Sequence, residues 1–181
     1  LNQRGHTSNT KGRERQWLVL TQAKYSAFDI AHWFIHKNEV IDRNAEGAGD
    51  LSLLKLLKLL YYSEGCSLAL GKGSLFNEKI LAWEYGPVVK EVWEKYKDNP
   101  YNLTLSNEER ASLSKISNED NSMLEEVFNV FGSYSAWALS MKTHKETPWL
   151  KATKNGTVFN KPLSRAVIKK FFQDNYIDLS C

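Results

Sequence analysis

The clearest hydrophobic pattern lies between residues 51 and 70, where leucines recur at helical spacing. At 100° per residue these leucines cover about two-thirds of a helix circumference, and Lys55 and Lys58 fall together in the remaining strip. The pattern therefore predicts a largely buried central helix with one narrow, solvated lysine edge. Peptides built from Leu and Lys can also bind membranes, but further globular pattern follows this segment.

Apolar residues recur at helical spacing in several other segments. A serine with an acidic residue three positions later marks two helix starts, Ser26 with Asp29 and Ser106 with Glu109. In the segment 134–142, Trp137 and Met141 are predicted to point inward. The expected fold is mainly α, a single compact multi-helix domain around a buried central helix, and the pattern leaves room for a short β-hairpin. The additional helices are predicted at 26–37, 106–116, 118–131, 134–142, 147–151 and 164–174.

An aromatic-rich segment follows the central helix. Residues 75–85 read as irregular or extended, with Ala82 on one side and Trp83 on the other. Gly86-Pro87 is predicted to begin a new helix, because proline is favoured at the first helical position. Tyr85, which lies directly before this break, is expected at the surface.

The positive charge of the chain is concentrated at its beginning. The 181 residues carry a net charge of +3, with 42% hydrophobic and 25% charged residues, as in ordinary globular proteins. Residues 1–24 hold five basic residues and one acidic residue, so residues 25–181 are nearly neutral. We expect a flexible basic tail over 1–24 and a helical domain over 25–181. Because the sequence begins at Leu1 rather than Met, the tail is expected to include some foreign or upstream sequence.

The location and the chemistry are constrained by what the sequence lacks. Residues 1–24 have no apolar core of a signal peptide, and lysines interrupt the longest apolar run, so we expect a cytoplasmic protein that spans no membrane. His32 and His36 have metal-ligand spacing, but the simpler interpretation is two partly exposed histidines. Ser140 near His144 lacks the sequence context of a catalytic serine. We therefore expect no catalytic, cofactor-binding or metal-binding residues, and no enzyme activity.

A set of short motifs resembles one protein family in order and spacing. The chain is similar to the Panacea domain, also described as the SocA-like antitoxin or phage-associated GepA-like family, over about residues 25–176. The most specific motifs are the AW-x-YGPV segment and the Pro-Trp pair near the C-terminal end. Two segments, 1–24 and 42–50, depart from a minimal member. The matching motifs are Asp29-Ile30-Ala31, Leu54-Lys55-Leu56, Lys58-Leu59-Leu60-Tyr61-Tyr62, Leu75-Phe76-Asn77-Glu78, Ala82-Trp83-Glu84-Tyr85-Gly86-Pro87-Val88, Ser135-Ala136, Leu139-Ser140, Thr143-His144, Pro148-Trp149 and Ile168-Lys169-Lys170-Phe171-Phe172.

The resemblance implies a function that the motifs alone do not. Members of the family are antitoxins of two-gene toxin–antitoxin operons in bacteria and prophages, and they neutralise a cognate toxin by direct protein contact. One member is instead a proteolytic adaptor that delivers its toxin to a ClpXP-type protease. The resemblance identifies neither the toxin nor the oligomeric state.

Four side chains are candidates for contact with such a partner. Trp83 and Tyr85 flank the chain break, and binding hot spots favour Trp and Tyr. Lys55 and Lys58 would offer a basic edge to an acidic partner. The main expectation is an antitoxin that binds its toxin protein. The alternatives are a regulator that binds nucleic acid through the basic tail, or an adaptor for the protease.

Overall fold

The computed structural model describes residues 23–41 and 51–176, and α3 (Leu53–Ala69) lies at the centre of this part. α3 packs against α2, α4, α6, α7, α9 and β2. Sixteen of its seventeen residues are buried, which confirms the predicted buried central helix. The other helices are α2 (Ala27–Val40), α4 (Lys90–Tyr96), α5 (Asn107–Ala111), η1 (Ser112–Lys115), α6 (Asn118–Phe131), α7 (Ala136–Thr143), α8 (Thr147–Thr153) and α9 (Arg165–Asn175).

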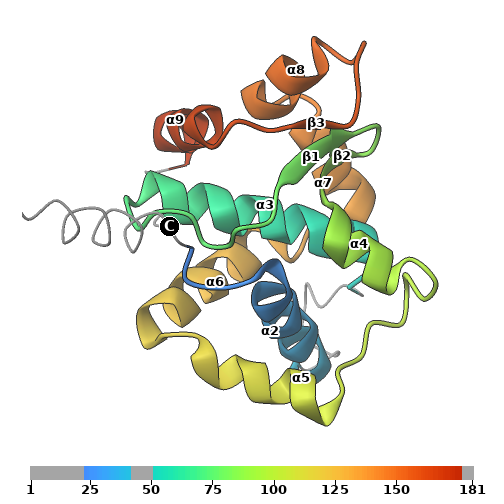
Figure 1. Ribbon diagram of the computed structural model, residues 1–181, viewed down its shortest axis with the longest axis vertical. Helices are drawn as coiled ribbons and strands as arrows, with labels where there is room; N and C mark the ends of the chain where they lie inside the picture. Colours follow the sequence, from blue (N-terminus) through green and yellow to red (C-terminus); the bar gives the residue numbers. More distant parts are fainter. Residues whose placement is uncertain (1–22, 42–50, 177–181) are drawn as a thin grey trace, which may run out of the picture.

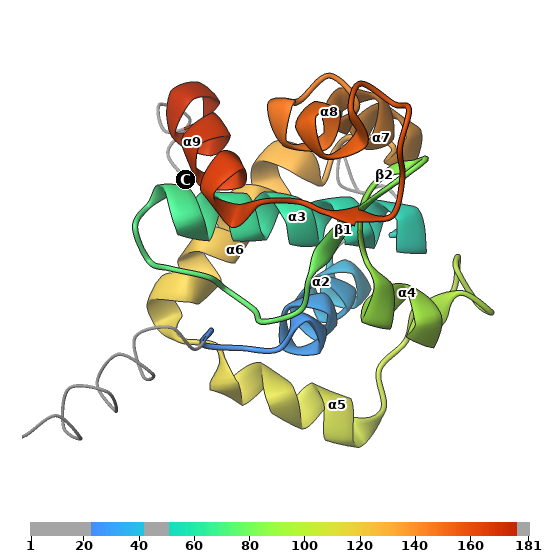
Figure 2. The same cartoon turned by 45° about the horizontal axis from the view of Figure 1, so that its top comes forward.

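The remaining elements form two layers around α3. Helices α8 and α9 lie on one side with the small sheet, and α2, α5 and α6 lie on the other (Figure 1). In the turned view, α7 and α8 lie over the sheet end of α3, and α4 follows the sheet (Figure 2). The mainly helical fold is therefore confirmed. Within the described ranges, no helix is long and apolar enough to cross a membrane.

The helix starts at the two predicted capping boxes are confirmed. The hydroxyl of Ser26 accepts a hydrogen bond from the backbone N–H of Asp29, and the Asp29 carboxylate accepts one from the backbone N–H of Ser26. Ser106 and Glu109 exchange the same pair at the start of α5. These caps satisfy donors that a helix N-terminus otherwise leaves unpaired.

The predicted helix at Gly86-Pro87 is wrong, because this segment is a strand. β1 (Ile80–Trp83) pairs antiparallel with β2 (Gly86–Val89), and β3 (Lys161–Pro162) joins the other edge of β1. Gly86 has a φ of +99°, which favours glycine and permits the tight turn through residues 84–85. Proline is tolerated in β2 because this is an edge strand. Helix α4 begins only at Lys90.

The prediction that the lysine edge of the central helix is solvated is also wrong. Lys55 is 3% exposed and Lys58 is 0% exposed. Each ammonium group donates a hydrogen bond to a distant backbone carbonyl, that of Gly132 for Lys55 and that of Pro87 for Lys58. The periodicity was correct about the face of the helix, but it could not reveal that other segments cover this face.

The expected boundary between a tail and a domain stays a prediction. Residues 1–22, 42–50 and 177–181 lie outside the described part, and so do the predicted loop over 44–50 and nearly all of the predicted basic tail. The described chain begins at Ala23, and Lys24 already forms an ion pair with Asp120 at 3.0 Å.

Candidate partner-binding surface

The turn between β1 and β2 is held by buried side chains from three helices. The Lys58 amine of α3 donates to the Pro87 carbonyl at 3.0 Å. The Ser140 hydroxyl of α7 donates to the Tyr85 carbonyl at 2.7 Å. The Trp149 indole of α8 donates to the Trp83 carbonyl at 3.0 Å. The carbonyl groups of every second residue from Trp83 to Pro87 are thus fixed by side chains far apart in the sequence, so the turn is a rigid part of the surface.

Two further contacts leave little space inside this turn. A Cβ atom added at Gly86 would lie 2.6 Å from the Thr143 hydroxyl and 2.8 Å from Cε of Lys58. The His144 ring packs against Trp149 in a tilted arrangement with ring centroids 4.3 Å apart, and it forms a hydrogen bond with the backbone of Glu84. Gly86 is therefore required both for its backbone conformation and for its lack of a side chain.

Burial changes the ionisation of the two basic groups beneath the turn. Burial lowers the pKa of Lys58 to about 7, because an ammonium group loses its hydration in the interior. Burial also lowers the pKa of His144, and the nearby Lys58 charge adds to this effect, whereas the bond to Glu84 opposes it. Lys58 is consequently far less positive near neutral pH than a surface lysine, and the lowered pKa of His144 favours its neutral form.

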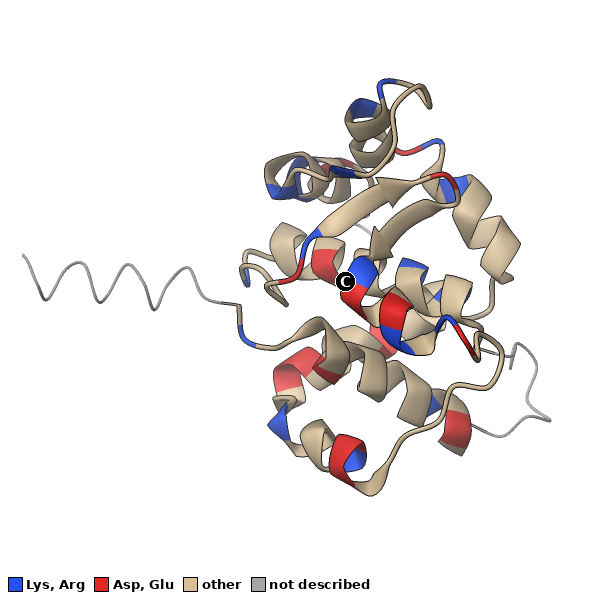
Figure 3. Ribbon diagram, turned by 45° about the vertical axis from the view of Figure 1, so that its right-hand side comes forward, with Lys and Arg blue, Asp and Glu red and all other residues tan. Residues whose placement is uncertain are grey.

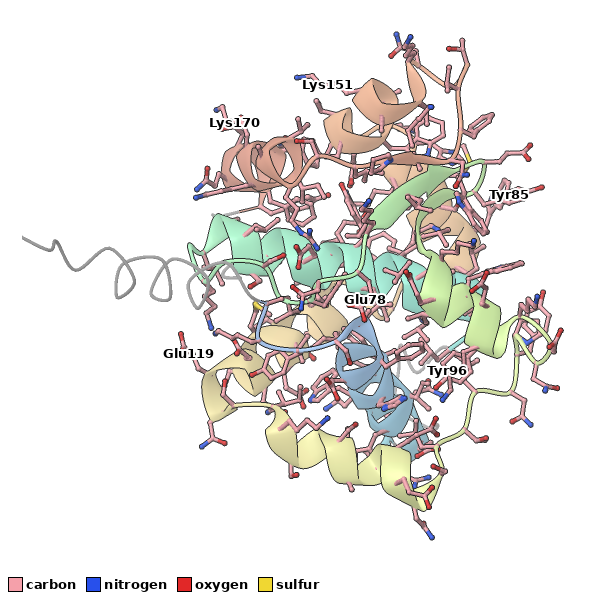
Figure 4. The ribbon with its side chains drawn as sticks, in the orientation of Figure 1. Glu78, Tyr85, Tyr96, Glu119, Lys151 and Lys170 are labelled. Atoms are coloured by element: carbon pink, nitrogen blue, oxygen red, sulfur yellow. The ribbon has the colours of Figure 1, made fainter. Side chains whose placement is uncertain are left out.

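The outer side of the turn carries Tyr85, which is 55% exposed and extends away from the domain (Figure 4). It lies at the rim of a groove with a volume of about 740 Å³. We call this hollow the aromatic groove. Its lining comes from α3, the hairpin, α4, α7 and the segment before β3: Leu53, Leu54, Leu57, Trp83, Glu84, Tyr85, Val88, Lys90, Trp93, Pro100, Trp137, Phe159 and Asn160.

Aromatic side chains dominate the groove. Trp83 and Trp93 meet edge to face, with centroids 5.1 Å apart. Trp137 is 59% exposed and Phe159 is 42% exposed, although both are large apolar groups. Leaving such groups in water is unfavourable unless another surface covers them. The arrangement is suited to receiving apolar side chains of a partner.

Two of the four predicted contact residues lie in this groove, and two do not. Trp83 and Tyr85 line it, whereas Lys55 and Lys58 are buried and carry no accessible charge. Lys58 instead holds the turn from below. The predicted contact with a partner through any of these residues stays a prediction.

The sequence reasoning missed Trp137 and Phe159. Trp137 was predicted to point inward, and its 59% exposure shows that this was wrong; Met141 is likewise exposed. Leu139 and Thr143 lie on the buried face of α7, and the helical spacing puts Trp137 and Met141 on the opposite face. Phe159 follows the turn at Asn155-Gly156 and belongs to no periodic segment, so no sequence signal indicated it.

A buried carboxyl group at the start of α8 was also missed. Glu146 accepts hydrogen bonds from the hydroxyls of Tyr61 at 2.8 Å, Tyr62 at 3.0 Å and Tyr176 at 2.8 Å. Burial raises the pKa of Glu146, although these hydrogen bonds act in the opposite direction. The cluster joins α3, α8 and the end of α9, so its evident role is structural.

The histidine pair is not arranged as a metal site. His32 is buried, contrary to the expected partial exposure, and its Nδ1 lies 3.1 Å from the Ser112 hydroxyl. His36 faces Glu39 and Arg110. Over residues 23–41 and 51–176, no group of three or more His, Cys, Asp or Glu side chains could hold a metal ion.

Comparison with known proteins gives one match. No curated protein and no solved structure matches the chain. The family model described as "Antitoxin SocA-like, Panacea domain" matches residues 56–150. This range includes Lys58, the hairpin, Ser140 and Trp149, which are the residues that build and hold the turn. Because the match covers just over half of the chain, the protein belongs to the family of SocA-like antitoxins with a Panacea domain.

Proposed function

We propose that this protein is the antitoxin of a two-gene toxin–antitoxin system, and that it neutralises its cognate toxin by direct binding at the aromatic groove. Family membership supports the antitoxin role. The observation that supports the location is the exposure of Tyr85, Trp137 and Phe159 around one apolar groove. The protein acts by binding rather than by catalysis.

The composition of the groove is that of a binding hot spot. Trp and Tyr are enriched among residues that contribute most to binding, and they act best in pockets that lose their water in the complex. The groove offers three tryptophans and one tyrosine. A specific complex generally buries more than about 1,000 Å² in total, so we expect the toxin to cover the groove and its surroundings.

The rigid turn favours tight binding. Tyr85 is carried by a turn whose carbonyl groups are fixed by Lys58, Ser140 and Trp149. A rigid surface loses little conformational entropy when a partner binds, and this loss is one of the main costs of association. The same hydrogen bonds therefore serve both the fold and the proposed interface.

The test is co-expression with the product of the neighbouring gene, followed by copurification and measurement of the dissociation constant. We expect the wild-type chain to restore growth and to form a complex with this product. Tyr85→Ala and Trp137→Ala should each weaken the complex by about 2 kcal/mol or more, which is roughly thirtyfold. The measurement with purified proteins contains no protease, so a stable complex there separates direct binding from delivery of the toxin to a protease.

Tyr134→Ala is the matched control. Tyr134 is 44% exposed but does not line the groove. This variant should bind like the wild type. If the neighbouring product neither inhibits growth nor binds the chain, the antitoxin proposal fails. If it binds but both groove variants behave like Tyr134→Ala, the proposed location is wrong.

A further inference from the structure

Residues 25–181 are nearly neutral overall, but their charges are unevenly distributed. Residues 136–176 contain eight lysines and arginines and two acidic residues, whereas residues 51–135 contain nine basic and twelve acidic residues. The basic segment forms α7, α8, β3 and α9. In Figure 3 its lysines and arginines lie in the upper part, and the acidic residues lie mainly below. Lys151 and Lys170 extend outward from this layer (Figure 4). The layer thus presents a positive surface.

A second groove lies within this basic layer, between α7 and α9, with a volume of about 580 Å³. We call it the lysine groove. Its walls combine apolar groups with hydrogen-bond donors, and they include Ala138, Met141, Lys142, Lys145, Phe171 and Asn175. A wall of this mixed kind suits a protein segment that carries both apolar and acidic side chains.

The two lysines of this groove are available to an anion. Lys145 is exposed, and Lys142 is partly exposed with its amine 5.3 Å from the ring centre of Tyr176. Neither lysine forms an ion pair with another described residue. Other cations of the layer are already engaged, since Arg165 pairs with Glu64 and Lys170 pairs with Asp174.

One carboxyl group does lie at the floor of the lysine groove. Glu146 is 4% exposed, and three tyrosine hydroxyls donate to its oxygen atoms. Its oxygens are therefore occupied and shielded from an incoming ligand. Burial raises the pKa of Glu146, whereas the three tyrosine hydrogen bonds and the nearby Lys142 charge act in the opposite direction. The rim consequently remains dominated by the two lysines.

The lysine groove and the aromatic groove are both lined by residues of α7. Trp137 lines the aromatic groove, and Met141, four residues later on α7, lines the lysine groove. Residues four apart lie on the same face of a helix. Both side chains are exposed, so an apolar ridge joins the two grooves.

We infer that the lysine groove is a second docking site of the proposed toxin interface, and that it receives an acidic segment of the toxin whose carboxylates pair with Lys142 and Lys145. This inference rests on the proposed function for the identity of the partner. Charge complementarity across an interface mainly sets the association rate and the choice of partner. The aromatic groove would supply most of the affinity, and the lysine groove would orient the toxin.

The test compares two double variants with the same loss of charge from the same layer. Lys142→Gln/Lys145→Gln removes the rim charges, and Lys151→Gln/Lys154→Gln removes two exposed lysines that do not line the groove. Two exposed ion pairs correspond to a roughly two- to thirtyfold weaker complex. We expect this loss, together with a weaker dependence on salt, only for the rim variant.

Each outcome separates the inference from the proposed function. If the wild-type chain forms no complex with the neighbouring gene product, both fall. If a complex forms and the two double variants bind the neighbouring gene product equally well, the inference is overturned while the antitoxin role stands. A short DNA duplex serves as a second probe in the same titration. If the duplex binds, and the rim variant loses this binding while toxin binding is unchanged, the groove recognises nucleic acid and the inference is wrong.

Discussion

Replacing Lys58 by methionine separates the stability of the domain from the order of its hairpin turn. Lys58 is fully buried, and its amine donates to the Pro87 carbonyl at 3.0 Å. Its pKa falls from the ordinary lysine value of 10.5 to about 7, because burial disfavours the charged form. Methionine has a similar volume and shape but neither charge nor donor. The substitution therefore removes the cost of the buried charge and the bond to the turn together.

The size of the effect follows from the pKa difference. The unfolded chain binds more protons than the folded protein between pH 7 and 10.5, so the contribution of Lys58 to the free energy of unfolding rises with pH in this window. The difference of about 3.5 between the unfolded-state and folded-state pKa values of Lys58 corresponds to a folded state destabilised by about 5 kcal/mol below pH 7. An unsatisfied Pro87 carbonyl costs about 1–3 kcal/mol. We expect Lys58→Met to be more stable than the wild type at pH 7 by about 2–4 kcal/mol.

Urea unfolding at two pH values provides the assay. Between pH 7.5 and 9.5, the advantage of Lys58→Met over the wild type should shrink by about 2–3 kcal/mol, because unfolding of the wild type requires the neutral buried amine to take up a proton, which becomes less favourable as the pH rises. Lys79→Met, a change at an exposed lysine beside β1, should show no such dependence. A difference between Lys58→Met and the wild type that stays constant with pH would refute the reasoning. Despite its stability, Lys58→Met should bind toxin more weakly, because the turn loses one of its anchors.

Three further predictions concern the hairpin and two buried acids. Gly86→Ala should destabilise the protein by about 2–4 kcal/mol in thermal unfolding, because its φ of +99° disfavours a side chain and the added Cβ would lie only 2.6 Å from the Thr143 hydroxyl. A loss below about 0.5 kcal/mol would contradict this. Glu146→Ala should cost about 3 kcal/mol or more in urea unfolding, since three buried hydroxyls lose their acceptor, whereas Tyr176→Phe should cost about 1–2 kcal/mol. Asp120→Asn should reduce stability at pH 7 and reduce it less at pH 3. Burial alone would raise the pKa of Asp120, but hydrogen bonds and the nearby Lys24 charge hold it below 3.8. The carboxylate therefore contributes to the free energy of unfolding above that pH, and this contribution is lost as the pH falls through the folded-state pKa. An equal loss of stability at both pH values would refute this.

Local sequence information predicted the helices well. The leucine pattern of α3 and the capping boxes at Ser26 and Ser106 depend on residues within one or two turns of each other, and the structure confirms them. The exposure of Tyr85 and the alternating burial of β1 were also predictable, because they follow from a chain break and a period of two. The motif resemblance indicated the family that the match over residues 56–150 shows.

Information from distant segments was needed for the rest of the site. A glycine followed by proline fits a helix start as well as an edge strand, and only the pairing with β1 decides between them. Trp137 was misplaced because the short α7 gives a weak periodic signal, and its burial depends on which face meets α3. Glu146 could not be recognised as buried, because the three tyrosines that satisfy it come from α3 and the end of α9.

The sequence by itself thus determined where this chain forms helices, which faces of them are apolar, and which family it belongs to, since these depend on short-range spacing and on motifs. Only the tertiary structure decided what the polar residues do. Lys58 became a buried anchor because the Pro87 carbonyl lies within its reach, and Glu146 became a shared acceptor because three tyrosine hydroxyls meet at its carboxylate. Both facts arise from which segments meet in space, and the spacing of residues along the chain does not contain that information.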